Sequence, residues 1–409
     1  MKRRKFLGSL GTGAIALSAS RLKAMPVEKG AEPGREGGKI DSKKNAGATA
    51  AEGSNEASSA DETAEEIYRR SYVTDAMCFG AAPPRSYVPY LTGSKVEALR
   101  TSGFTAISMC MTSGTSRTAD NPFAGLKKNI ETWDAFVEKH SDVFMKVTTA
   151  AQMDEAKRSG RVGFVYNLQR TSPIGWNLDR LKDLAGMGVR QIQLSYSQRN
   201  YSADGCWERT NAGLSRFGLE VIEALKKNRI ILDLSHVGDQ SAFEAIQFSK
   251  APMIFSHSGC LSLCPHPRNV SDRNIKAMAD KGGVFCVYNQ SGWLTKDPVI
   301  SMDHYIQHVE HVINLGGEDH VAMGTDGDAV DMTAMRPDEV ARHQAGFDRR
   351  RAEYPQLDWD VKHMRVPELS HPQRLLHLAQ ALHKRGYKAG TIEKIIGGNY
   401  VRVFKEVVG

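Results

Sequence analysis

Several features that mark well-known protein classes are missing from this chain of 409 residues. No apolar run reaches the roughly 20 residues needed to span a bilayer, and no GxGxxG fingerprint follows the first predicted strand. The six cysteines are scattered, and the closest pair, Cys260 and Cys264, has neither CxxC spacing nor a second pair beside it. Much of the basic excess behind the formal net charge of +7 sits near the N-terminus. We therefore expect no permanent membrane anchor, dinucleotide-binding fold, disulfide scaffold or nucleic-acid partner.

The first 25 residues are predicted to be an export signal. Arg3-Arg4-Lys5-Phe6-Leu7 precedes a moderately apolar run of small residues from Gly8 to Ala19, and this order is typical of the twin-arginine route. A charged, frayed terminus is the alternative. Because the run is about half of a membrane span, cleavage is favoured over anchoring. The pattern predicts a periplasmic protein.

Residues 26–62 are predicted to be a disordered linker, because they hold almost no large apolar side chain to offset the entropy of ordering. Residues 63–409 then form one domain, in which short apolar runs alternate with helical stretches. Eight such βα units favour a closed (β/α)8 barrel of the TIM type, an α/β fold, over an open doubly wound sheet. The eight predicted strands are Tyr72–Met77, Ala106–Met111, Val162–Leu168, Gln191–Tyr196, Ile230–Leu234, Met253–Ser256, Gly283–Tyr288 and His320–Gly324.

Polar side chains follow these strands at the edge where such barrels carry their chemistry. His236 and His257 come directly after two successive strands, and Asp326 follows the eighth. Two imidazoles and a carboxylate form a metal-binding set that suits zinc, and the alternative is a hydrogen-bonded polar core. Zinc in such a set lowers the pKa of bound water to about 7 and polarises a carbonyl, so hydrolysis of an amide or ester is the expected reaction.

Other polar residues share this placement. Gln169 follows the third predicted strand, Tyr196 ends the fourth, and Arg268 follows the sixth. The guanidinium of Arg268 suits a substrate carboxylate, although a surface ion pair is the commoner use of such a residue. Asp326 either binds the metal or shuttles a proton between water and the leaving amine, and the sequence leaves this choice open.

Two further features are expected to be structural. His304, His308 and His311 share one helical face, but the valines around them indicate an ordinary barrel helix, so we expect them to line its boundary rather than to bind a second metal. The stretch Ala334–Asp360 is dense in charged and aromatic residues. It suits a solvated insertion, with a lid or a subunit contact as the alternative.

The sequence resembles the membrane (renal) dipeptidase family over most of residues 70–409. The spaced motifs Asp-Leu-Ser-His-Val, Ser-His-Ser and Gly-Gly-Asn-x-x-Arg-Val-Phe are jointly specific, and a Gly-Leu-Ser-x-Phe-Gly segment adds to them. The resemblance implies a (β/α)8 barrel that holds two zinc ions, hydrolyses dipeptides or related small amides, and is often a homodimer. The matching runs are Gly213–Gly218, Ile231–Val237, Ala251–Ser258, Arg268–Val270, Val321–Val330 and Gly397–Phe404.

The resemblance also implies roles for four residues already singled out. His236 and His257 fall on the histidines that hold the second zinc ion, and Asp326 falls on the aspartate ligand of the first. Arg268 falls on the arginine that receives the C-terminal carboxylate of the substrate. Asp326 is also the candidate catalytic residue.

Four other positions depart from the family pattern. Met77 and Phe79 occupy the slots of the HxD ligand pair at the end of the first strand. Gln169 replaces the bridging glutamate and is at most a weak ligand, because a neutral amide supplies no charge. Tyr196 replaces a histidine that contacts substrate, so we predict it to bind substrate. Together these changes predict one zinc ion rather than two, or none.

Three functions stay open at this point. The leading hypothesis is a periplasmic metal-dependent dipeptidase that acts on a small peptide or amide with a carboxylate. The alternative is a catalytically degenerate barrel that binds or helps to mature an exported peptide metabolite without hydrolysis, since fold does not determine function. A purely structural or partner-binding protein is the weakest candidate.

Overall fold

The computed structural model describes residues 62–79, 93–111, 122–297, 299–329 and 365–409, together with Ala341, Ala345 and Asp348. The predicted export signal lies outside the described residues. So do all but the last residue of the predicted linker and most of Ala334–Asp360.

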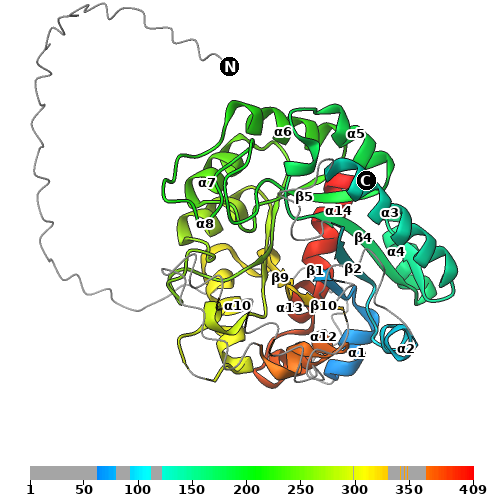
Figure 1. Ribbon diagram of the computed structural model, residues 1–409. Coiled ribbons are helices and arrows are strands. Elements are labelled where there is room, and N and C mark those ends of the chain that lie inside the picture. The colour runs from blue at the N-terminus through cyan, green and yellow to red at the C-terminus, as the bar shows by residue number, and fades with distance from the viewer. Residues whose placement is uncertain are drawn as a thin grey trace, which may run out of the picture. The chain divides into compact units, whose positions relative to one another are not determined.

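One curled sheet of parallel strands forms the centre of the fold, and helices cover its outer face (Figure 1). The strands pair in the order β10-β1-β2-β4-β5-β6-β7-β8-β9, and β3 adds to β4. The strands are β1 Thr74–Phe79, β2 Ala106–Cys110, β3 Phe144–Lys146, β4 Val162–Leu168, β5 Val189–Gln193, β6 Ile231–Asp233, β7 Ile254–Ser258, β8 Val284–Val287, β9 Val321–Met323 and β10 Gly327–Asp328.

The sheet closes through the segment 321–328. Its first part, β9, pairs with β8, and its last part, β10, pairs with β1 through Cys78 to Gly327 and Phe79 to Asp328. The predicted barrel is therefore confirmed, and each of the eight predicted strands is present. β3 and β10 were not predicted, and the two residues of β10 are too short a run to show a period.

Helices alternate with the strands, as a barrel with crossover connections requires. Helix α6 shows why these segments are helical: Ser215 caps its first turn by accepting a hydrogen bond from the N–H of Gly218 at 2.9 Å, and its apolar residues share one buried face. No helix among the described residues is long and apolar enough to cross a membrane. The helices are α1 Ala64–Arg70, α2 Ser94–Arg100, α3 Pro122–Lys139, α4 Ala150–Ser159, α5 Asp179–Gly186, α6 Arg216–Lys227, α7 Asp239–Phe248, α8 Asp272–Asp280, α9 Ser291–Leu294, α10 Met302–Gly316, α12 Arg374–Lys384, α13 Ala389–Glu393 and α14 Asn399–Val408.

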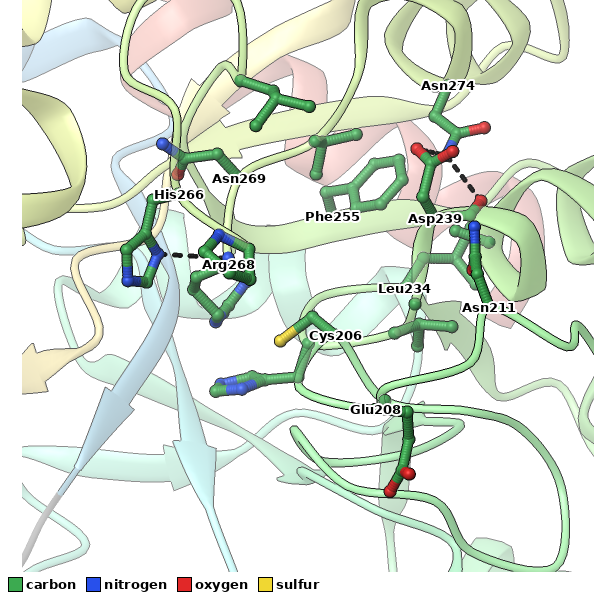
Figure 2. A pocket seen from close by; sticks show the side chains of 18 of the residues that line it. Cys206, Glu208, Asn211, Leu234, Asp239, Phe255, His266, Arg268, Asn269 and Asn274 are labelled. Atoms are coloured by element: carbon green, nitrogen blue, oxygen red, sulfur yellow. Dashed lines mark hydrogen bonds between the residues drawn. The ribbon is translucent and has the colours of Figure 1, made fainter. Parts of the chain in front are cut away.

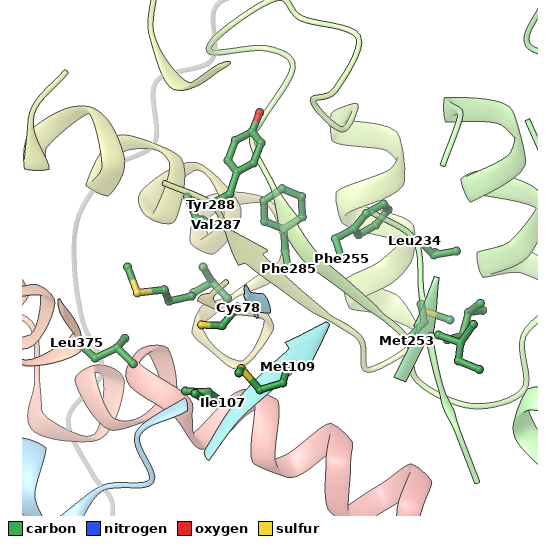
Figure 3. Close-up of a cluster of buried hydrophobic side chains, with 14 of the residues drawn as sticks. Cys78, Ile107, Met109, Leu234, Met253, Phe255, Phe285, Val287, Tyr288 and Leu375 are labelled. Atoms are coloured by element: carbon green, nitrogen blue, oxygen red, sulfur yellow. The ribbon is translucent and has the colours of Figure 1, made fainter. Parts of the chain in front are cut away.

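Two hydrophobic cores hold the barrel together. The larger lies mainly between the strands and the covering helices and includes Phe255, Phe285 and Leu375 (Figure 3). The smaller joins the first residues of several strands to α14, whose Tyr400 and Phe404 are buried. Because α14 packs at the N-terminal ends of the strands, the opposite end of the barrel is left for polar side chains.

Candidate active site

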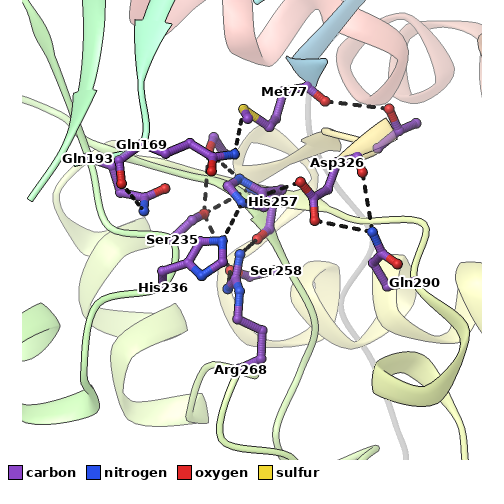
Figure 4. Close-up of polar contacts among 12 residues, drawn as sticks. Met77, Gln169, Gln193, Ser235, His236, His257, Ser258, Arg268, Gln290 and Asp326 are labelled. Carbon is purple, nitrogen blue, oxygen red and sulfur yellow. Dashed lines mark hydrogen bonds and ion pairs between the residues drawn. The ribbon is translucent and has the colours of Figure 1, made fainter. Parts of the chain in front are cut away.

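His236 and His257 meet at the C-terminal ends of β6 and β7 (Figure 4). Their Nε2 atoms lie 3.0 Å apart, and both side chains are buried. Nitrogens bound to a tetrahedral zinc ion at ~2.0–2.1 Å lie roughly 3.3 Å apart. The pair therefore needs to open by only a few tenths of an ångström to hold one zinc-class ion.

Serine hydroxyls hold the far side of each imidazole. Ser197 Oγ lies 2.8 Å from Nδ1 of His236, and Ser256 Oγ lies 2.7 Å from Nδ1 of His257. Ser256 Oγ also donates a hydrogen bond to the carboxylate of Asp233. This carboxylate accepts two more hydrogen bonds, from the backbone N–H groups of Ser235 and Ser256. Metal-binding histidines usually have such a partner on the other ring nitrogen.

This hydrogen-bond chain assigns the protons of the two rings. Because the Ser256 hydroxyl proton is committed to Asp233, Nδ1 of His257 donates to Ser256 Oγ, and Nε2 of His257 carries a lone pair. Burial, with Arg268 nearby, lowers the pKa of His257 and keeps its ring neutral. The proton between the two Nε2 atoms then belongs to His236.

The backbone at the site is unusual in three places. His236 and Asp326 have φ values of 63° and 54°, in the left-handed region that few residues other than glycine adopt. A Cβ atom at Gly324 would lie 1.7 Å from the carbonyl oxygen of Ser256, so only glycine lets β9 pass this close to β7.

Asp326 lies beside the histidine pair but is not in hydrogen-bond contact with it. Its Oδ1 is 3.9 Å from Nε2 of His257, and its Oδ2 accepts a hydrogen bond from Gln290 at 3.1 Å. Arg365 donates to the backbone oxygen of Asp326 at 2.9 Å. Burial raises the pKa of Asp326, which is opposed by the positive charges of Arg268 and Arg365. The carboxyl group is placed to exchange a proton near the histidines or to turn toward them.

Arg268 is a buried cation at the same end of the barrel. It is 2% exposed and donates to the backbone oxygen of His257 at 2.7 Å and to Ser258 Oγ at 3.1 Å. Among the described residues no carboxylate forms an ion pair with it, and its Nε makes no hydrogen bond. A buried guanidinium without a paired anion is well suited to bind one.

Among the described residues, the first-strand half of the site offers no charged ligand. Met77 turns its sulfur toward Nε2 of Gln169 at 3.7 Å (Figure 4). Asp75 is fully buried and turned away, since its two oxygens accept hydrogen bonds from the backbone N–H and the hydroxyl of Thr325 at 2.9 and 2.7 Å. Arg374 lies 3.6 Å from the same carboxylate. Asp75 therefore serves to hold the loop before Asp326.

Tyr196 lies against His236. The centroids of the two rings are 4.1 Å apart and their planes make an angle of 23°, which is a stacked contact. The predicted substrate residue thus covers one of the two imidazoles.

A cavity of about 230 Å³ lies between the loops that follow β5, β6 and β7 (Figure 2). Its wall includes His236, Arg268 and the Cys206 thiol, whose pKa burial raises to about 11. A thiol with such a pKa stays protonated near neutral pH and is a poor nucleophile.

The described residues contain no cluster of three or more His, Cys, Asp or Glu side chains arranged to hold a metal. The three histidines of α10 have separate partners: His308 is buried between the N–H of Cys260 and the oxygen of Leu294, at 2.9 and 2.8 Å, while His304 and His311 contact two different aspartates. At the barrel end, His236 and His257 fit one ion and a third donor must move to join them.

Comparison with known proteins places this site in a family. A model of the membrane dipeptidase family, peptidase family M19, matches residues 98–344, more than half of the chain. The chain belongs to the membrane dipeptidase family. The resemblance inferred from the motifs is thus confirmed. Dipeptidase verJ of Clonostachys rogersoniana is 30% identical over 222 residues, which are 53% of this chain and 56% of that dipeptidase, so the match spans little more than half of the relative.

Solved structures share the fold of this chain. An amidohydrolase from Pseudomonas aeruginosa superposes with a TM-score of 0.71 and 26% identity, over 85% of this chain and 99% of that chain. The probable dipeptidase PvdM from Pseudomonas aeruginosa superposes with a TM-score of 0.69 over 84% of this chain and 97% of that chain. At 16% identity, the second likeness concerns the fold alone.

Of the residues singled out in the sequence, the structure brings His236, His257 and Asp326 to one end of the barrel, and Arg268 joins them through its hydrogen bond to the backbone oxygen of His257 (Figure 4). Gln169 faces Met77 at the same end. The residues that hold these side chains by hydrogen bonds were not predicted from the sequence. Three of these, Asp233, Ser235 and Ser256, belong to the very motifs that carry the histidines, so their positions were a usable signal. The supporting residues are Ser197, Asp233, Ser235, Ser256, Gln290 and Arg365.

Proposed function

We propose that this protein is a hydrolase that cleaves dipeptides or related small amides bearing a carboxylate, with a single zinc-class ion. The observation that supports it most is the pair of Nε2 atoms 3.0 Å apart, each ring being anchored through Nδ1 by a serine hydroxyl. Membership in a family of dipeptidases supports the reaction class. The substitutions at Met77, Phe79 and Gln169 argue for one ion rather than two.

In this proposal the chain's own residues have separate tasks. His236 and His257 would hold the ion through Nε2, with Gln169 at most a weak third ligand. The chemistry supplied by a bound zinc-class ion is water activation at neutral pH and polarisation of the scissile carbonyl. Arg268 binds the substrate carboxylate and so orients the amide bond.

Asp326 is the proposed proton carrier. Its carboxyl lies beside the histidine pair, and burial raises its pKa toward the range in which a carboxyl group both accepts and returns a proton. Gln290 holds its Oδ2, which leaves Oδ1 to face the reacting atoms. Asp326 would accept the proton from water and deliver it to the leaving amine.

A dipeptide assay tests the proposed function. Protein purified without chelator and supplied with zinc is incubated with a panel of dipeptides, and the released amino acids are quantified. We expect turnover that falls at least 100-fold in both His257→Ala and Asp326→Asn. His311→Ala serves as the matched control, because His311 pairs with Asp272 on the outer helices and should leave turnover unchanged. Turnover that survives His257→Ala would contradict the proposal.

A non-hydrolytic role is the second candidate, and the contact between Met77 and Gln169 is the observation that favours it. This contact fills the first-strand half of the site with neutral groups. The protein would then bind or help to mature an exported peptide metabolite. Tight binding of a carboxylate-bearing peptide without any turnover, measured by calorimetry with and without zinc, would support this candidate over the first.

Location and assembly are also part of the proposal. The twin arginines support export to the periplasm, and the family resemblance supports a homodimer.

A further inference from the structure

His236 needs support from outside its own strand. It follows β6 in a turn with a left-handed backbone, φ 63°, so sheet pairing does not set the direction of its side chain. Ser197 holds Nδ1 from the next strand end at 2.8 Å. Hydrogen bonds to Ser197 at Nδ1 and to His257 at Nε2 hold the two ring nitrogens, and a contact on the ring face would in addition hold the ring against tilting about the line that joins them.

Tyr196 contacts the face of the His236 ring and so restrains the ring plane. It precedes Ser197, so two consecutive residues after β5 contact the imidazole, the serine at its edge and the tyrosine on its face. The ring centroids are 4.1 Å apart with an interplanar angle of 23°. A group at the edge together with a group on the face determines both the position and the plane of the ring.

Arg170 adds a third layer to this arrangement. It follows β4, and its guanidinium carbon lies 5.1 Å from the centroid of the Tyr196 ring, within the range of a cation–π contact. Its Nε makes no hydrogen bond to any described residue. The stack of Arg170, Tyr196 and His236 thus crosses three neighbouring strand ends and ties the plane of the tyrosine ring to the barrel.

We propose that Tyr196 is a positioning residue, which holds the plane of the His236 imidazole so that its Nε2 faces Nε2 of His257. This goes beyond the substrate contact predicted for the same residue, because the face of the tyrosine ring is already occupied by the imidazole. The proposal rests on the proposed function in taking His236 as a metal ligand. The ring face carries the role, and the hydroxyl group does not.

Zinc affinity is the first test. The dissociation constant is measured by competition with a chromophoric chelator for wild type, Tyr196→Phe and Tyr196→Ala. Partners that orient metal-binding histidines typically contribute 10–100-fold to affinity, so we expect Tyr196→Ala to weaken binding about 10-fold. Tyr196→Phe keeps the stack and should stay within about 2-fold of wild type. Tyr201→Ala is the matched control, because Tyr201 is 48% exposed and stacks on Trp176 instead.

Two results in that experiment would overturn the proposal. Equal affinity in wild type and Tyr196→Ala would show that the stack does not hold the ligand. An equal loss in Tyr196→Phe and Tyr196→Ala would assign the effect to the hydroxyl group.

Imidazole ¹⁵N spectra of the metal-free protein separate this proposal from the proposed function. In wild type and Tyr196→Phe we expect His236 to show one tautomer, with the proton on Nε2, because the ring plane keeps its hydrogen bonds to Ser197 and His257 aligned and these bonds select the tautomer. In Tyr196→Ala the ring should tilt, which weakens both hydrogen bonds, so the two tautomers should average. If wild type binds no zinc, the proposed function fails while this comparison still decides the role of Tyr196, and an unchanged single tautomer in Tyr196→Ala would refute it.

Discussion

Replacing Arg268 should remove discrimination between substrates with and without a free carboxylate. The guanidinium commits two of its five N–H groups, to His257 and Ser258, and no described carboxylate forms an ion pair with it. A hydrogen bond to a charged group contributes about 1.5–3 kcal/mol. Arg268→Met should therefore lower kcat/KM about 10–150-fold for a dipeptide, and less for the corresponding dipeptide amide, whose neutral end group forms no ion pair with the guanidinium.

The comparison of the two substrates isolates the carboxylate. Loss of the hydrogen bonds to His257 and Ser258 affects both substrates equally, so it cancels in the ratio of the two kcat/KM values. Arg273→Met is the matched control, because Arg273 is a half-exposed arginine on α8 that pairs with Asp239. The measurement is steady-state kinetics on both substrates for the three proteins. An equal loss on dipeptide and dipeptide amide would refute the assignment of Arg268 to the substrate carboxylate.

Three further predictions concern stability and export. Burial lowers the pKa of His308 from 6.5 to about 4. Its contribution to the free energy of unfolding is therefore complete above pH 6.5 and falls by about 3 kcal/mol as the pH drops toward 4. Across this pH range, the urea midpoint should fall less in His308→Asn than in wild type. Arg374→Met leaves the Asp75 carboxylate buried without its cation and should lower the free energy of unfolding in urea by about 3–5 kcal/mol. Adding Asp75→Asn to the same chain should recover most of this loss, and no recovery would contradict the buried ion pair. The Arg3→Lys/Arg4→Lys variant should stay in the cytoplasm, as detected by cell fractionation. Normal export of this variant would rule out the twin-arginine route.

The fold could be read from the sequence because each long strand repeats the same local pattern. An apolar run followed by a helix predicted all eight main strands, and the histidines after β6 and β7 could be placed together because neighbouring parallel strands end at the same edge. The short strand β10 could not be predicted, because its pairing with β1 depends on closure of the whole barrel.

The support of the site was harder to predict than its ligands. The contacts of Ser197 and Tyr196 with His236 join residues about 40 positions apart, and no local period reports such a pairing. The direction of the Asp75 side chain could not be predicted from the sequence either, because the fold of the chain turns its carboxylate toward Thr325 and Arg374. The direction of a side chain at the end of a strand depends on bulges, and the register of β1 against β2 shifts between Asp75 and Cys78.

The number of zinc ions per chain tests the central claim most directly. Protein purified without chelator is supplied with excess zinc, freed of unbound ion, and analysed by elemental mass spectrometry beside the His236→Ala/His257→Ala variant. The single-ion site predicts about one zinc per chain in the wild type and close to none in the variant. Two ions in the wild type, or none, would contradict it.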